Sequence, residues 1–187
     1  MPHVIYAPFT SLDGFVTDPN GGIDFHQPDE EVHRYINELE KTYSDHIYGD
    51  RTYHVMNAWE NLPGSHLQDP VMREYAEYWR GVRKTVVTDA HEGIDERIYT
   101  VVPKLTDDVL ARIITTATGD IVLSEAEHAA IALEHGLLDR IHLGIVPVIL
   151  GGGTPLFTGM HRSNLTLVDI RQFASGWVFL RYDVEKT

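Results

Sequence analysis

The chain has 187 residues, of which 43% are hydrophobic and 23% charged, with a formal net charge of −13 and no cysteine. This length and composition predict one domain over residues 1–187 with a core of its own. The acidic charge argues against binding to nucleic acid or to anionic membranes. The absence of cysteine excludes disulfides and thiolate metal sites. Neither a signal peptide nor a membrane-spanning apolar run is visible, so we expect a cytoplasmic protein.

The first part of the chain predicts a strand, a loop and a helix. Residues 3–9 are apolar and read as a strand, and a short extended pair at 15–16 stands between two turn signals, residues 11–14 and 18–22. A glycine-rich loop after a first strand is a common place for a mobile active-site flap. Apolar residues at helical spacing then predict a helix over 29–43.

Strands and helices alternate through the middle of the chain. The predicted strands are 45–49, 84–88, 98–102 and 121–123, and the predicted helices are 51–59, 71–79, 106–116 and 124–135. Gly49 directly precedes a helix that we expect to start at Arg51 and Thr52. Free backbone N–H groups beside a guanidinium suit an anion. Ser124 and Glu127 have the spacing of a capping box, which would satisfy the first amides of the last helix.

Residues 137–157 are the most distinctive stretch. An apolar, β-branched run over 139–150 predicts a strand that is covered on both faces. Pro147 cannot donate a hydrogen bond to a sheet, so we expect the chain there to lie at an edge or a bulge. The glycines at 151–153 predict a tight turn, after which Leu156 and Phe157 should return to the core.

The end of the chain completes the predicted fold. Residues 165–173 and 177–184 read as an antiparallel hairpin. Alternating strands and helices followed by antiparallel strands predict an α/β fold. We expect a three-layer α/β/α sandwich with a mixed, mostly parallel sheet that ends in this hairpin.

Taken in order, four motifs resemble the dihydrofolate reductase-like fold. More narrowly, they resemble the family that contains the C-terminal reductase domain of bifunctional riboflavin-biosynthesis deaminase/reductases. The motifs are Ser-Leu-Asp-Gly at 11–14, Gly-Asp-Arg-Thr-Tyr at 49–53, Lys-Thr-Val-Val-Thr at 84–88, and Leu-Leu-Asp at 137–139 with residues 147–157. The resemblance covers nearly the whole chain. No deaminase-type zinc motif is present, so we do not expect the activity of the whole bifunctional enzyme.

This resemblance implies an NAD(P)H-dependent reductase of a pteridine-like or ribosylaminopyrimidine-like substrate, similar to 5-amino-6-(5-phosphoribosylamino)uracil reductase. Asp13 would be the catalytic residue, orienting a ring nitrogen or assisting proton transfer. The implied cofactor-binding residues are Gly49, Arg51, Thr52, Thr88, Asp89, Ser124, Glu125 and Ala126. Ser11, Phe25, Met56 and Trp59 would contact the substrate, and no metal site is expected. A homodimer is also implied by the family.

Two positions depart from the family pattern. The family usually has glycines where this chain has Ser124, Glu125 and Ala126, so carboxylates would stand where the cofactor diphosphate should lie. Asp89 would repel the 2′-phosphate of NADPH and would favour NADH. The alternative is therefore a non-catalytic homodimeric small-molecule-binding module on the same fold that has lost dinucleotide binding.

Simpler interpretations of the same residues remain open. Asp13 could only shape its turn, and Arg51 could be a surface residue of a capped helix. Phe25, Met56 and Trp59 could be ordinary core packing.

Overall fold

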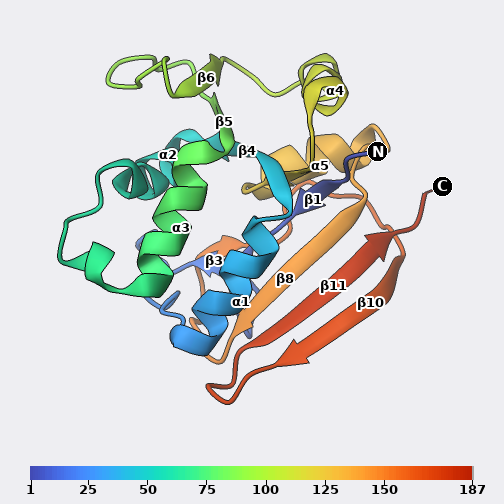
Figure 1. Ribbon diagram of the computed structural model, residues 1–187. Coiled ribbons are helices and arrows are strands. Elements are labelled where there is room, and N and C mark those ends of the chain that lie inside the picture. The colour runs from blue at the N-terminus through green and yellow to red at the C-terminus, as the bar shows by residue number, and fades with distance from the viewer. Residues whose placement is uncertain (187) are drawn as a thin grey trace.

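The chain folds around a mixed β-sheet, which the computed structural model describes together with its helices over residues 1–186 (Figure 1). The strands lie in the order β10-β11-β8-β1-β7-β4-β5-β6, with β2 beside β8. Their bounds are β1 Val4–Tyr6, β2 Phe9–Ser11, β4 Tyr43–Gly49, β5 Arg83–Val87, β6 Tyr99–Val102, β7 Asp120–Leu123, β8 Arg140–Val146, β10 Leu165–Gln172 and β11 Val178–Val184. A separate two-stranded sheet pairs β3 (Phe15–Thr17) with β9 (Thr154–Pro155).

The direction of the strands divides the main sheet in two. Strands β8, β1, β7, β4, β5 and β6 pair in parallel, and β2 is parallel to β8. Their carboxyl ends therefore meet at one edge of the sheet. Strands β11 and β10 add the predicted antiparallel hairpin beside β8.

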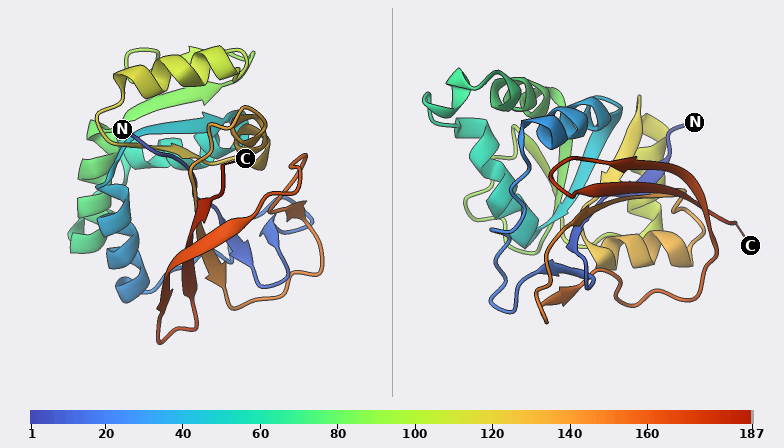
Figure 2. Two further views of the ribbon diagram at one scale, coloured as in Figure 1. Left: turned by 90° about the vertical axis from the view of Figure 1, so that its right-hand side faces the viewer. Right: turned by 90° about the horizontal axis from the view of Figure 1, so that it is seen from below.

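Helices cover the sheet on both faces, which confirms the predicted α/β sandwich. Helices α1 (Glu30–Glu40) and α3 (Pro70–Gly81) contact each other on one side, as the left view of Figure 2 shows. Helices α4 (Asp107–Thr116) and α5 (Ala126–Glu134) pack into a different half of the core. The short α2 (Asp50–Met56) and two 3-10 helices, Asn57–Asn61 and His66–Gln68, connect β4 to α3. No helix within residues 1–186 is long and apolar enough to cross a membrane.

Local side chains explain where three of these helices begin. Asp29 accepts a hydrogen bond from the backbone N–H of Val32 at the start of α1, and Thr106 does the same for Val109 at the start of α4. Asp69 caps α3, whose first residue is Pro70. These are favourable amino-terminal residues because they satisfy backbone donors that have no partner within the helix.

Several predicted boundaries are wrong. Helix α1 ends at Glu40, because Tyr43 already belongs to β4, where its buried hydroxyl bonds to His142. The first strand is split into β1 and β2. Leu156 is buried as predicted. Phe157 keeps 46% of its surface exposed, and its ring meets the ring of Tyr6 edge-on.

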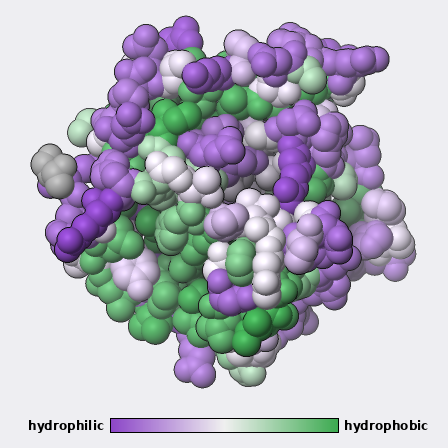
Figure 3. All heavy atoms as spheres, turned by 180° about the vertical axis from the view of Figure 1, so that it is seen from behind, coloured by the Kyte–Doolittle hydropathy of each residue, from purple (hydrophilic) through white to green (hydrophobic). Residues whose placement is uncertain are grey.

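Strand β10 exposes an apolar surface. Leu165, Leu167, Val168 and Ile170 are 39–62% exposed on this edge strand. Figure 3 shows hydrophobic residues gathered over the lower part of the face seen from behind, where the β8–β11–β10 end of the sheet lies. We refer to these four residues as the β10 patch.

Candidate functional site

The predicted cofactor residues meet at the carboxyl edge of the parallel strands. Gly49, Thr88 and Ser124 end or follow β4, β5 and β7, which are neighbours in the sheet. The Thr88 hydroxyl lies 3.4 Å from a carboxylate oxygen of Asp50, in the first turn of α2. The N–H of Ser124 donates to the carbonyl of Ile47, 3.2 Å away. In open α/β sheets, ligands bind at this edge of the strands.

The amino end of α5 differs from the predicted capping box. The helix begins at Ala126, and Glu125 is the residue before it, with an extended backbone and no side-chain bond to the helix amides. The carbonyl of Glu125 accepts the first helical bond, from Ala129. Ser124 is thus one position too early to cap α5, and the prediction that Ser124 and Glu127 satisfy its amides is wrong.

The Glu125 side chain turns toward Gly49. A Cβ placed on Gly49 would lie 3.1 Å from both the carboxyl carbon and one carboxylate oxygen of Glu125. The side chain is 24% exposed, yet both of its oxygens are buried and have no hydrogen-bond partner within residues 1–186. Burial of a carboxylate without a donor is costly, so packing rather than hydrogen bonding holds this side chain in place.

The imidazole of His128 lies beside that carboxylate. Its Nδ1 lies 3.3 Å from a Glu125 oxygen, but the atoms are not aligned as a hydrogen bond. Burial and the negative charge of Glu125 both raise the pKa of Tyr6, whose hydroxyl donates to the carbonyl of Leu156. Within the described chain, no Lys or Arg lies within ion-pair distance of Glu125.

Arg51 links α2 to the first long loop. Its guanidinium donates to the carbonyl of Gly21, 2.9 Å away, and the rest of the side chain is exposed. Thr52 is half-buried in the same turn. The loop is closed on itself by Asp18, which accepts from the N–H groups of Asn20 and Gly22. Arg51 therefore supplies the positive charge expected at this end of the site.

Asp13 is bound to the glycine loop that follows β8. Its carboxylate accepts hydrogen bonds from the N–H groups of Leu150 at 3.1 Å and Gly151 at 2.7 Å. The Ser11 side chain and these amides lower the pKa of Asp13, so this carboxyl group is ionised at neutral pH. An ionised carboxylate orients a donor or a water but has no proton of its own to give. Its role in catalysis stays a prediction.

Of the four predicted substrate residues, one is buried and three are half-buried. Ser11 is buried, and its hydroxyl accepts from the N–H of Phe15. Phe25, Met56 and Trp59 are half-buried against one aromatic part of the core, and the ring centre of Trp59 is 4.5 Å from that of Tyr75. These contacts agree with core packing. Because the three side chains are only half-buried, their predicted contact with a substrate stays a prediction.

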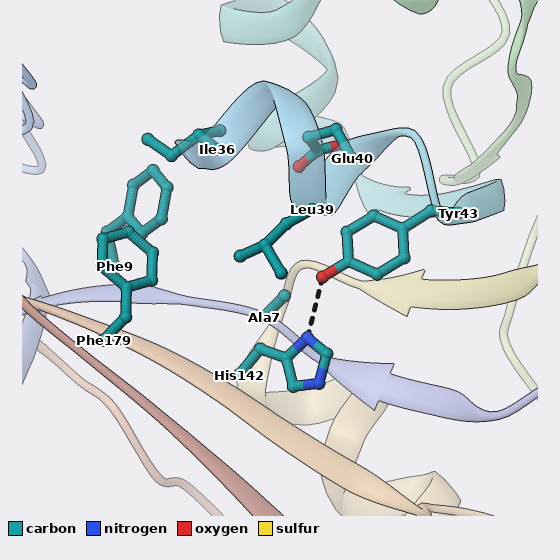
Figure 4. A pocket seen from close by; sticks show the side chains of 8 residues that line it. All are labelled: Ala7, Phe9, Ile36, Leu39, Glu40, Tyr43, His142 and Phe179. Atoms are coloured by element: carbon teal, nitrogen blue, oxygen red, sulfur yellow. Dashed lines mark hydrogen bonds between the residues drawn. The ribbon is translucent and has the colours of Figure 1, made fainter. Parts of the chain in front are cut away.

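A small apolar cavity lies elsewhere, between α1 and the sheet (Figure 4). It is lined mainly by apolar side chains, and the hydroxyl of Tyr43 bonds to Nδ1 of His142 at 2.8 Å beside it. Burial and the nearby charges of Arg181 and Arg140 lower the pKa of His142 to about 4. The polar pair is thus satisfied internally and belongs to the core.

The carboxyl edge fits a dinucleotide only in part. Gly49, Arg51 and Thr88, the residues predicted to hold a phosphate-bearing cofactor, all lie at or next to this edge. Asp89, however, is exposed beside Thr88, and the carboxylate of Glu125 fills the space at the start of α5. Two unit charges about 5 Å apart repel by about 3 kcal/mol at an effective dielectric constant of about 20. As arranged, residues 124–126 do not fit a diphosphate.

His128 is the residue of this site that the sequence analysis did not assign to it. The available signal was its spacing, because Glu125 and His128 are three residues apart at the start of a helix and so lie on the same face. That Glu125 lies against Gly49 depends on the neighbouring strand and required the structure.

Comparison with known proteins identifies the family of the chain. The chain matches the RibD C-terminal domain family over residues 2–179. Protein YyaP of Bacillus subtilis (strain 168) is 28% identical over 179 residues, which cover 92% of this chain and 89% of YyaP.

Solved structures show the same fold at low sequence identity. A putative riboflavin biosynthesis protein from Shewanella sp. PV-4 has a TM-score of 0.75 at 18% identity, with 98% of this chain and 99% of that chain covered. A bifunctional deaminase and 5-amino-6-(5-phosphoribosylamino)uracil reductase from Thermotoga maritima has a TM-score of 0.69 at 16% identity. There the match covers 98% of this chain but 57% of that protein. With its fold, the order of its motifs and the match over residues 2–179, the chain belongs to the RibD C-terminal domain family.

Proposed function

We propose that the chain is a reductase that transfers hydride from a reduced nicotinamide nucleotide to a small heteroaromatic, pteridine-like or ribosylaminopyrimidine-like substrate. One observation supports this most strongly. Residues 49–53, 88–89 and 124–126 are gathered at the carboxyl ends of three adjacent parallel strands in a chain of this family. A reduced nicotinamide would supply the hydride, and the protein would position the two rings.

The residues at this edge have separable roles in the proposal. Arg51 and Thr52 bind an anionic group of the cofactor, and Asp89 accepts hydrogen bonds from a free ribose hydroxyl, which favours NADH over NADPH. Asp13 positions the glycine loop and a water through its ionised carboxylate, and that water delivers the proton.

The first test is a titration with NADH and, separately, with NADPH, following the fluorescence of Trp59, Trp79 and Trp177. Tighter binding of NADH than of NADPH is the expected result. Consumption of the dihydronicotinamide is then followed with pteridine-like and ribosylaminopyrimidine-like compounds. Failure of both nucleotides, and of reduced nicotinamide riboside, to bind at millimolar concentration would refute the reductase proposal.

Asp13→Asn tests the role of the first loop. The amide has one acceptor oxygen in place of two, so one of the bonds to Leu150 or Gly151 is lost. A positioning role predicts that kcat falls while KM for the nucleotide changes little. An unchanged kcat with an intact fold would remove Asp13 from the mechanism.

A second candidate function follows from Glu125. If its buried carboxylate keeps every dinucleotide out, the chain is a binding module for a small molecule without a cofactor. Titration of the heteroaromatic compounds alone distinguishes the two, because only the module would bind them while showing no affinity for either nucleotide or for reduced nicotinamide riboside.

The proposed assembly is a homodimer formed through the β10 patch. Its four apolar side chains lie on an edge strand and present no charge, whereas the chain as a whole carries a net charge of −13. Two copies would repel elsewhere and gain apolar burial here. Sedimentation at several protein concentrations tests the assembly.

A further inference from the structure

The Glu125 carboxylate lies at a position that an anionic ligand would need. It stands at the amino end of α5, a helix of nine residues with no side-chain cap, and it contacts the backbone of Gly49. Free amides at a helix start attract anions. The Glu125 carboxylate thus brings a negative charge close to a helix start at which a bound phosphate group would otherwise be stabilised.

A second observation, the buried imidazole of His128, points to the same place. The His128 side chain is only 9% exposed, and its Nδ1 lies 3.3 Å from a Glu125 oxygen without forming a hydrogen bond to any group in residues 1–186. Both members of this pair are thus buried with unused hydrogen-bonding capacity. Buried polar atoms usually have a partner, so this pair is not ordinary core packing and marks a place where a ligand would meet charged and polar groups.

We propose that Glu125 is a specificity residue that excludes diphosphates from the amino end of α5, so that the site favours a reduced nicotinamide ligand without a diphosphate. This inference rests on the proposed function, because it concerns the donor that the reductase uses. The exclusion has two parts: the charge of the carboxylate repels the diphosphate, and its volume fills the space against Gly49.

Two substitutions separate charge from volume. Glu125→Gln keeps the size of the side chain and removes its charge. Glu125→Ser removes both and supplies a residue that favours a helix start, so the start of α5 should be kept. Glu127→Gln is the matched control, since Glu127 lies in the first turn of the same helix but is exposed. Circular dichroism establishes that each variant is folded.

The probes are NADH, which contains a diphosphate, and reduced nicotinamide riboside, which contains no phosphate. Tryptophan fluorescence gives the dissociation constant of each probe without requiring turnover. We expect Glu125→Ser to tighten NADH binding by at least about tenfold, and Glu125→Gln to tighten it by less. Binding of the riboside should stay within about twofold in all variants, and Glu127→Gln should match the unmodified protein.

Three other results would contradict the inference or the reductase proposal. If the unmodified protein already binds NADH as tightly as both Glu125 variants, the inference fails and the reductase proposal stands. If Glu125→Ser tightens both probes equally, the effect is a general opening of the site and the selectivity against diphosphates is refuted. If neither probe binds to any variant, Glu125 is not the obstacle and the reductase proposal fails as well.

Discussion

The buried imidazole of His142 should make the protein sensitive to mild acid. Burial, with the charges of Arg181 and Arg140, lowers its pKa to about 4, from a reference value of 6.5. As the pH falls below about 6.5, the unfolded chain takes up a proton that the folded protein does not accept until about pH 4. The stabilisation is therefore fully present above pH 6.5 and is lost progressively toward pH 4.

The size of the effect follows from the two pKa values. At about pH 5 the unfolded imidazole is almost fully protonated and the folded one is mostly neutral, which corresponds to about 2 kcal/mol of lost stability. His26 adds to the slope, because burial lowers its pKa to about 4 as well. The Tyr43 hydroxyl reinforces the neutral state of His142 through the bond to Nδ1, since burial raises the pKa of that tyrosine and keeps its proton in place.

Urea unfolding at about pH 8 and about pH 5 measures this contribution. The difference in unfolding free energy between the two conditions should be smaller by about 2 kcal/mol in His142→Gln than in the unmodified protein. His54→Gln is the control, because the side chain of His54 is 69% exposed. An equal pH dependence in His142→Gln and the unmodified protein would refute the assignment of this acid sensitivity to His142.

Three further substitutions test the packing and the assembly. Gly144→Ala should lower stability by about 1–3 kcal/mol in thermal unfolding, because the new Cβ would lie 2.6 Å from a ring carbon of Phe9; an unchanged melting temperature would show that the ring moves freely. Glu60→Gln should cost about 3 kcal/mol in denaturant unfolding, because it removes the carboxylate 3.0 Å from the ammonium of Lys84, whose side chain is 1% exposed. Retained stability would mean that the other contacts of Lys84 suffice. Ile170→Asp should shift sedimentation toward the monomer with little change in melting temperature, because Ile170 is 62% exposed; a persisting dimer would place the interface elsewhere.

Patterns in neighbouring residues determined most of the elements. The alternation of strands and helices and the terminal hairpin were predicted from the sequence and are present in the structure. These signals are local, because hydrophobic periodicity and capping depend on residues within a few positions of one another. The order of the motifs likewise led to the family, which the match over residues 2–179 confirms.

The tertiary structure decided where the Glu125 side chain lies in the site. Ser124 and Glu127 have the local spacing of a capping box, yet α5 starts one residue later, and Glu125 turns under Gly49. The sequence by itself placed a carboxylate in the region of the diphosphate. It could not show that both oxygens are buried beside His128, because that burial depends on β4 and β7 lying side by side. Contacts between distant segments override a local preference of about 1 kcal/mol when they determine what a side chain packs against.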